Sequence, residues 1–259
     1  MASKKGYAER SVELLWGDRE LPTRGPKPGV TLERVVQAAV EVADEFGLQA
    51  LSMRSVAERL GIGTMSLYTY VPGKAELIDL MQDTATGECP LPDPATGWRP
   101  QLEQLARGSW ILYGRHPWTL EVARLRRVPG PHEVAAEEAS LRAVAGLGLT
   151  PSEMAATANL VVGYVDGLAR RVADTVEHER RTGVSDEAWW SARESLWEKI
   201  GDCDPDLGPA FPTITSVYTE GGFDQPDNGF EFGLQRLLDG IQVLVAERQA
   251  RRGSASPVS

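Results

Sequence analysis

Apolar side chains recur at steps of three and four residues along most of this chain, which is the spacing of helices with one buried face. The first such helix begins after Thr31, a residue type that caps helix N-termini, and ends at Gly47. Further helices are predicted over 98–115, 117–128, 131–147, 151–182, 185–202 and 227–250. No segment shows the sustained apolar alternation of a strand, so the pattern predicts an all-α protein.

Prolines and glycines interrupt this pattern and divide the chain. Residues 24–29 hold two prolines and two glycines and cannot be helical. Four prolines between 89 and 100 indicate a linker. The predicted organisation is a flexible N-terminal extension over 1–30, a domain over 31–88, a larger helical domain over 98–250 with a long irregular connection over 203–226, and a disordered tail over 251–259.

The segment LSMRSVAERLGIGTMSLYTYVPGK, from Leu51 to Lys74, has the pattern of two short helices joined by a tight turn. Ser52 can cap the first helix, and Gly61 stands where the turn needs a positive φ. The other positions follow the same plan: Ala57 is small where the helices cross, Ile62 plugs the turn, Thr64 caps the second helix and Leu67 faces the core. The pattern predicts a helix-turn-helix between Ser52 and Val71, a unit that places its second helix in the major groove of DNA.

Two later helices carry unusually regular stripes of apolar residues at alternating steps of four and three. One stripe runs from Met154 to Val172 and the other from Phe230 to Leu244. Such stripes pack in near-parallel bundles, and Gly163 would let a second helix approach closely. They could serve the core of one chain, or they could form a four-helix interface in a homodimer. The predicted interface residues are Val161, Val165, Leu168, Leu234, Leu237 and Ile241.

The net charge of −10 does not decide whether the chain binds nucleic acid. Residues 1–80 carry 10 basic and 11 acidic side chains, whereas residues 81–259 carry 17 and 26. The excess of acid therefore lies outside the helix-turn-helix, and phosphate affinity depends on local cations rather than on the total.

No enzyme motif, metal cluster or cofactor loop is recognisable. The pair His132-Glu133 lacks the second histidine of a zinc-protease helix, and Gly61-Ile62-Gly63 lacks the third glycine of a dinucleotide loop. No apolar run is long enough to span a membrane, and no secretory signal is present. Cys89 and Cys203 are interpreted as reduced thiols. We therefore expect a cytoplasmic protein that is not an enzyme and needs no cofactor or metal.

Six of the seven tryptophans lie beyond residue 90. Because helical cores usually fill with aliphatic residues, this enrichment suggests a cavity for a flat or bulky apolar compound, although an ordinary aromatic core would explain it equally well. The candidate ligand-binding residues are Trp110, Tyr113, Trp118, Tyr164 and Trp189.

The stretch from Thr31 to Leu80 resembles the DNA-binding domain of the tetracycline-repressor family of bacterial regulators. The run LxxRxxAxxLGI, the Leu-Tyr pair at 67–68 and Lys74 at the start of a following helix match its signature. The segment FEFGLQRLLDGI at 230–241 resembles, more loosely, the ligand-binding half of the branch that contains the tetracycline repressor itself.

The resemblance implies a role for each matching residue. Arg54 would reach a guanine edge, because its guanidinium fits O6 and N7. Thr64, Met65 and Ser66 would meet bases at the start of the recognition helix. Tyr68, Tyr70 and Lys74 would hold phosphates. Tyr70 replaces a frequent histidine of the family, and core packing is the alternative for both tyrosines. Arg24 and Lys27 are candidates for a minor-groove arm, the alternative being a solvated tail.

The resemblance also bears on the effector. Aligning Pro117 with the proline after the corresponding helix puts Leu112 where the tetracycline repressor has a metal-binding histidine, and leucine cannot ligate Mg²⁺. The prediction is a repressor that binds a palindromic operator in double-stranded DNA as a homodimer and is released by a small apolar or aromatic effector without a metal. The alternatives are a ligand-independent DNA-binding or architectural protein, or a helical enzyme with a DNA-binding head.

Overall fold

The computed structural model describes residues 6–17, 30–122, 127–185, 187–192, 199, 207–222 and 229–254. These residues contain helices and turns and no strand, so the predicted all-α class is confirmed. Arg24 and Lys27, the two candidates for a minor-groove arm, lie outside the described residues, as does Cys203.

The N-terminal helices form a compact head around one apolar core. We call residues 32–86 the reading head; it consists of α2 (Leu32–Phe46), the 3-10 turn η1 (Leu48–Ala50), α3 (Met53–Leu60), α4 (Thr64–Leu67) and α5 (Lys74–Thr86). As predicted, the Thr31 hydroxyl caps α2 by accepting from the Arg34 amide, and Gly47 ends α2 at φ 80°. Val35, Val56 and Leu67 are fully buried at the centre of this core.

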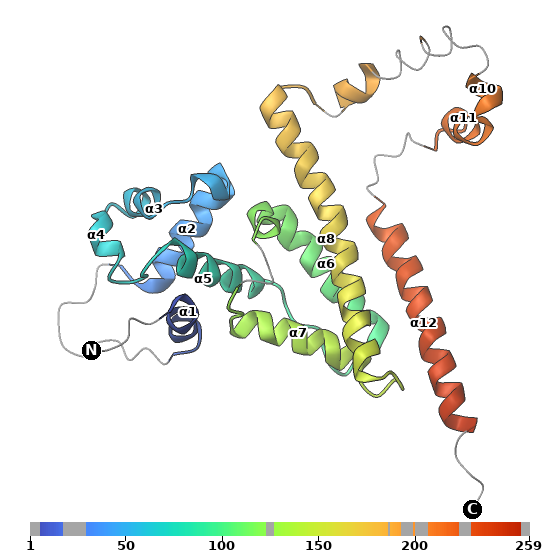
Figure 1. Cartoon of the computed structure of the whole chain (residues 1–259), viewed down its shortest axis with the longest axis horizontal. Coiled ribbons are helices and arrows are strands. Elements are labelled where there is room, and N and C mark those ends of the chain that lie inside the picture. Colours follow the sequence, from blue (N-terminus) through green and yellow to red (C-terminus); the bar gives the residue numbers. More distant parts are fainter. Residues whose placement is uncertain are drawn as a thin grey trace, which may run out of the picture. The chain divides into compact units, whose positions relative to one another are not determined.

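A helix that the sequence did not predict precedes the reading head. Residues 1–30 were expected to be a flexible extension, but Tyr7–Trp16 form α1, which packs along α5 (Figure 1). Its Leu14 joins the core of the head. The sequence did not predict α1 because the contacts with α5 that stabilise it are long-range and cannot be read from ten residues.

The rest of the chain is a set of longer helices. They are α6 (Trp98–Arg115), the 3-10 turn η2 (Pro117–Leu120), α7 (Pro131–Val144), α8 (Pro151–Thr182), α10 (Leu207–Ala210), α11 (Pro212–Thr219) and α12 (Phe230–Ser254), with residues 187–192 also helical. The helices predicted at 98–115 and 151–182 have these bounds.

Two predictions about the later helices were wrong. A helix was expected over 117–128, but its first residues, Pro117–Leu120, form a single 3-10 turn. The connection expected to be irregular over 203–226 contains α10 and α11. Pro212 is the first residue of α11, a position where proline is tolerated because no intrahelical hydrogen bond needs its amide.

Four of the six residues predicted to form a dimer interface on α8 and α12 are buried within their own chain. Val161, Val165, Leu234 and Ile241 are between 0% and 4% exposed within a single chain. A side chain already covered in this way cannot also be covered by a partner. Leu168 and Leu237 are half-buried.

The described chain divides into two compact units. The first comprises residues 1–166 and 234–259, and the second comprises residues 167–233. The first unit therefore holds the reading head together with α6, α7, the start of α8 and most of α12. The helix-turn-helix and the residues around Cys89 and His116 all lie in the first unit.

Candidate nucleic-acid interface

The helix-turn-helix begins with a reciprocal cap. The Ser52 hydroxyl accepts from the Ser55 amide at 3.0 Å, and the Ser52 amide donates to the Ser55 hydroxyl at 2.9 Å. Two of the amides that a helix N-terminus leaves without partners are thus satisfied. The predicted cap at Ser52 is confirmed.

The turn between α3 and α4 depends on one glycine. Gly61 has φ 67° and ψ 28°, a left-handed conformation that a side chain would strain. The next amide, that of Ile62, donates back to the Ala57 carbonyl at 3.0 Å, and the Ile62 side chain packs against the core. The predicted turn and its apolar plug are confirmed, and Ala57 is 1% exposed.

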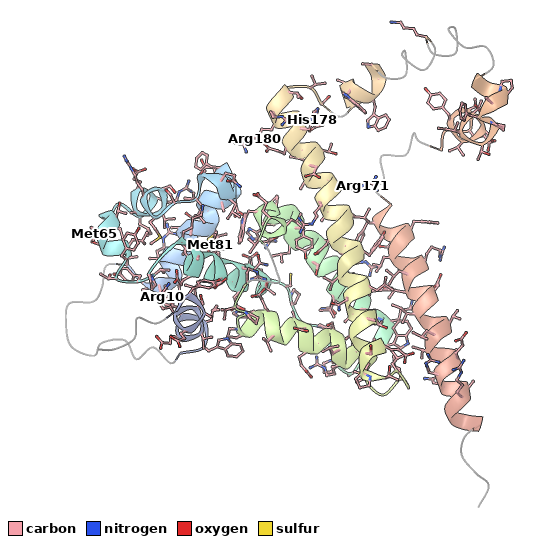
Figure 2. All side chains as sticks on the ribbon, viewed as in Figure 1. Arg10, Met65, Met81, Arg171, His178 and Arg180 are labelled. Carbon is pink, nitrogen blue, oxygen red and sulfur yellow. The ribbon has the colours of Figure 1, made fainter. Side chains whose placement is uncertain are left out.

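Helix α4 exposes the side chains that the resemblance assigned to base contacts. Met65 is 79% exposed at the outer edge of the head (Figure 2), Ser66 is exposed, and Thr64 is half-buried. Leu67 on the opposite side is fully buried and anchors the helix. Thr64 does not cap α4 as predicted, because the cap position is Gly63 and Thr64 is the first helical residue.

Arg54 projects from α3 into solvent with 82% of its side chain exposed. Its Nε donates to Glu58 Oε1 at 2.8 Å, one turn further along the helix, and this bond raises the pKa of the Arg54 guanidinium. The contact orients the guanidinium through Nε. The two Nη groups are the donors that match O6 and N7 of guanine.

The three residues expected at phosphates differ in exposure. Tyr68 is 45% exposed, whereas Tyr70 is half-buried and packs against the core. The alternative role of core packing therefore applies to part of the Tyr70 side chain and not to Tyr68. Lys74 begins α5 and is exposed, with Nζ 3.4 Å from the Leu48 carbonyl. Thr69, which no sequence motif marks, is also exposed.

A polar joint that sequence reasoning missed ties the reading head to the end of α6. His116 is 3% exposed; its Nδ1 lies 2.7 Å from Asp44 Oδ1 of α2, and its Nε2 lies 3.3 Å from Glu88 Oε2. The Trp118 indole also donates to Asp44 Oδ1, at 2.7 Å. Burial raises the pKa of Glu88, but hydrogen bonds from Arg115 and His116 outweigh it, so the pKa is lowered. No local motif marks these residues, because Asp44 lies more than 70 positions from its partners.

The five aromatic residues predicted to line a ligand pocket differ in burial. Trp118 belongs to the core of the reading head and Tyr113 is 4% exposed. Trp110 and Tyr164 are half-buried. Trp189 lies in the second unit, where it is 42% exposed and stacks edge-on against Trp190 with ring centroids 5.0 Å apart. For Trp118, the aromatic-core alternative holds.

A pocket of about 170 Å³ lies beside the polar joint. Its lining residues are Glu88, Cys89, Pro90, Gly108, Ile111, Leu112 and Arg115, which include none of the five aromatic candidates. Sites for drug-sized ligands usually have about 300 Å³ or more, so this pocket as it stands is too small for a polycyclic compound.

Two helices with a capped start, a glycine turn, a buried anchor and exposed side chains at Met65 and Ser66 of the second helix define a helix-turn-helix DNA-binding protein. Residues 35–81 match the bacterial regulatory proteins of the tetR family, and residues 91–245 match the tetracycline repressor-like C-terminal domain. The chain belongs to the TetR family of transcriptional regulators, which are not enzymes.

Relatives of known name agree with this assignment. The chain is 44% identical to the HTH-type transcriptional repressor DrrR1 of Streptomyces coeruleorubidus, over 98% of this chain and 92% of that protein. It is 30% identical to an HTH-type transcriptional regulator of Saccharopolyspora erythraea, over 92% of this chain and 95% of that protein. The fold matches ActR of Streptomyces coelicolor in complex with actinorhodin, with a TM-score of 0.66, 25% identity and coverage of 83% and 96%. The chain is thus a TetR-family transcriptional repressor.

Among the described residues, no helix is both long and apolar enough to cross a membrane.

Proposed function

We propose that this repressor binds a palindromic operator as a homodimer and leaves it when a small, largely apolar effector enters the domain that follows the reading head. The observation that supports contact of α4 with DNA bases is the difference in exposure between two of its residues. Leu67 is 0% exposed, whereas Met65 is 79% exposed. One side chain anchors the helix and the others stand where base edges would lie.

The outer faces of α8 and α12 are proposed as the dimer seam, in place of the buried stripes. Leu160 is 54% exposed and Val243 is 60% exposed, which leaves aliphatic surface in water. Each is three residues from a glycine on the same helix, Gly163 and Gly240, whose Cβ positions face open space. Glycine inside a helix costs about 1 kcal/mol relative to alanine, and close approach of a second helix would account for it.

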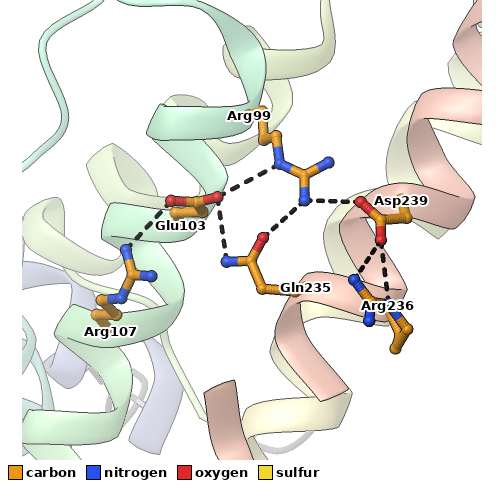
Figure 3. A network of polar contacts seen from close by, with 6 residues as sticks. All are labelled: Arg99, Glu103, Arg107, Gln235, Arg236 and Asp239. Carbon is orange, nitrogen blue, oxygen red and sulfur yellow. Dashed lines mark hydrogen bonds and ion pairs between the residues drawn. The ribbon is translucent and has the colours of Figure 1, made fainter. Parts of the chain in front are cut away.

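Helix α12 is tied to α6 by a network of polar contacts (Figure 3). Arg99 donates to Gln235 Oε1 at 2.7 Å and to Asp239 Oδ1 at 2.8 Å, and its hydrogen bond lowers the pKa of Asp239. Gln235 in turn donates to Glu103 at 3.3 Å. A shift of α6 would therefore be transmitted to the proposed dimer helix, and the joint at His116 would transmit it to the reading head.

The effector is proposed to be held without a metal. Leu112 is 7% exposed and has no lone pair to offer, and both ring nitrogens of His116 already face carboxylates. The structures of ActR with actinorhodin and with (S)-DNPA support a compound bound in this fold. Since the pocket beside Cys89 is small, binding would require the helices to separate.

The test combines selection of DNA sites with release by defined compounds. The full-length chain is used to select duplexes from a random pool, and fluorescence anisotropy measures its affinity for the selected operator. Actinorhodin and tetracycline, each with and without Mg²⁺, are then added. Selection of a two-fold symmetric site, with release by actinorhodin independent of Mg²⁺, is the expected result.

Three results would contradict separate parts of the proposal. Enrichment of no site would contradict operator binding. Enrichment of an asymmetric site bound by one chain would contradict the homodimer. Release only by tetracycline with Mg²⁺ would contradict the metal-free effector.

A further inference from the structure

Helix α5 carries a row of buried carboxylates that the DNA-binding role does not explain. Glu76, Asp79 and Asp83 are 3%, 1% and 6% exposed and share one face of the helix by their spacing. Buried carboxylates are costly unless each is paired or hydrogen-bonded. Each of these has its partner on another segment of the chain.

Two of the carboxylates are satisfied by α1. Arg10 binds Glu76 Oε1 through Nε at 2.7 Å and through Nη2 at 2.6 Å. The Tyr7 hydroxyl donates to Asp79 Oδ2 at 2.5 Å. Burial and this bond raise the pKa of Tyr7 to about 12, so the hydroxyl keeps its proton as a donor at neutral pH.

The third carboxylate holds the start of α7. Asp83 Oδ1 accepts from the backbone amides of His132 at 2.9 Å and Glu133 at 3.1 Å, and Oδ2 lies 2.9 Å from His132 Nδ1. Asp83 thereby caps a helix other than its own. The fit is tight, because a Cβ on Gly130 would lie 2.2 Å from the Asp83 carboxyl carbon.

The C-terminal end of α1 also contacts the segment that leads into α7. The Trp16 indole donates to the Pro129 carbonyl at 3.0 Å, two residues before α7 begins. Helix α1 therefore contacts α5, which carries Lys74 of the reading head, and also the segment that leads into α7. Figure 1 shows α1 alongside α5 near the start of α7.

We propose that α1 is a strap that fixes α5 against the first turn of α7, so that residues before the DNA-binding domain determine how strictly the dimer requires one half-site spacing. This inference rests on the proposed function. A two-fold protein reads half-sites at a fixed separation only if each reading head is held rigidly on the body of the dimer. Loosening the strap would let the heads adapt to other separations.

The experiment uses the full-length chain and its selected operator, together with an operator that has one base pair inserted at the centre. Two variants loosen the strap: Tyr7→Phe with Arg10→Gln, and Trp16→Phe alone. The second replaces the indole by a smaller ring without the N–H donor, at a half-exposed side chain, and so poses little risk to folding. Val12→Ala is the matched control, because Val12 is 46% exposed on the same helix.

For the wild type and Val12→Ala, we expect roughly tenfold weaker binding to the lengthened operator, comparable to the cost of a mismatch. In both loosened variants the ratio of the Kd for the lengthened operator to the Kd for the selected operator should fall to about threefold or less, and binding to the selected operator should be weaker. An unchanged ratio in folded Trp16→Phe would overturn the strap while leaving the proposed function intact. A wild type that selects no operator would overturn both.

Discussion

The indole Nε1 of Trp118 donates to Oδ1 of Asp44 at 2.7 Å, across 74 residues of sequence. Asp44 belongs to α2 of the reading head, and Trp118 lies in the turn after α6. The same oxygen lies 2.7 Å from His116 Nδ1, so one carboxylate receives both buried rings. The turn after α6 is therefore built into the core of the reading head.

Removing either side of this joint should destabilise the fold. Trp118→Phe loses one donor and leaves a void in the core, because Trp118 is 1% exposed, so the free energy of unfolding should fall by about 2–4 kcal/mol. Asp44→Ala leaves two buried donors without an acceptor and should cost about 2–3 kcal/mol. Urea denaturation measures both. Gln49→Ala is the control, because its 3.4 Å contact with Glu121 is exposed; equal losses in all three variants would contradict the joint.

The reading head could be predicted almost entirely from sequence because its determinants are local. Caps at Thr31 and Ser52 and the positive φ of Gly61 depend on residue types a few positions apart. The failures had a different cause. Helix α1 is stabilised by carboxylates 66 and 72 positions away, and no periodicity within ten residues records them.

The dimer interface and the ligand-binding residues could not be placed from the sequence for a related reason. A stripe on α8 shows that one face is buried but not by which chain it is buried, and the structure assigns Val161 and Val165 to their own chain. The enrichment in tryptophan is real, but Trp118 fills the core of the reading head rather than a cavity. Composition counts aromatic residues and cannot place them.

Two cations of the reading head should contribute differently to operator binding. Arg54→Ala should cost about 1–3 kcal/mol and relax preference at one base pair per half-site, because the guanidinium is proposed to read a base. Lys74→Ala should weaken binding to all sequences alike and reduce the slope of log K against log salt concentration by about one per monomer. Anisotropy over an operator set at several salt concentrations separates them, with Arg34→Ala on α2 as the control. Equal loss of sequence preference in both variants would refute the assignment.

The proposed dimer seam predicts opposite outcomes for exposed and buried apolar residues of the same helices. Leu160→Glu with Val243→Glu should give a folded monomer, because both side chains are exposed in one chain. Ile241→Glu should unfold the chain, because it buries an unpaired charge in the core. Sedimentation and circular dichroism distinguish the two, and Val134→Glu on α7 is the control. A wild-type dimer after the double change would place the seam elsewhere.

The contact between the start of α8 and α12 should make stability depend on acid pH. Glu153 Oε1 accepts from Arg248 Nε at 3.0 Å, and Oε2 accepts from the Thr150 amide at 2.8 Å. The Arg248 bond, followed by the amide, lowers the pKa of Glu153 from 4.5 to about 2. The folded state therefore holds this proton less tightly than the unfolded state. The stabilisation that the Glu153–Arg248 contact contributes should be complete above pH 4.5 and should disappear as the pH falls towards 2.

Thermal unfolding between pH 3 and pH 7, at one fixed protein concentration, measures this dependence. The wild type should lose stability steadily below about pH 4.5. Glu153→Gln should be less stable than the wild type at neutral pH and should show a smaller loss on acidification, so that the two curves converge. Glu138→Gln, an exposed change on α7, should follow the wild type throughout. Parallel curves for wild type and Glu153→Gln would show that the carboxylate keeps its ordinary pKa and that Arg248 does not hold α12 through it.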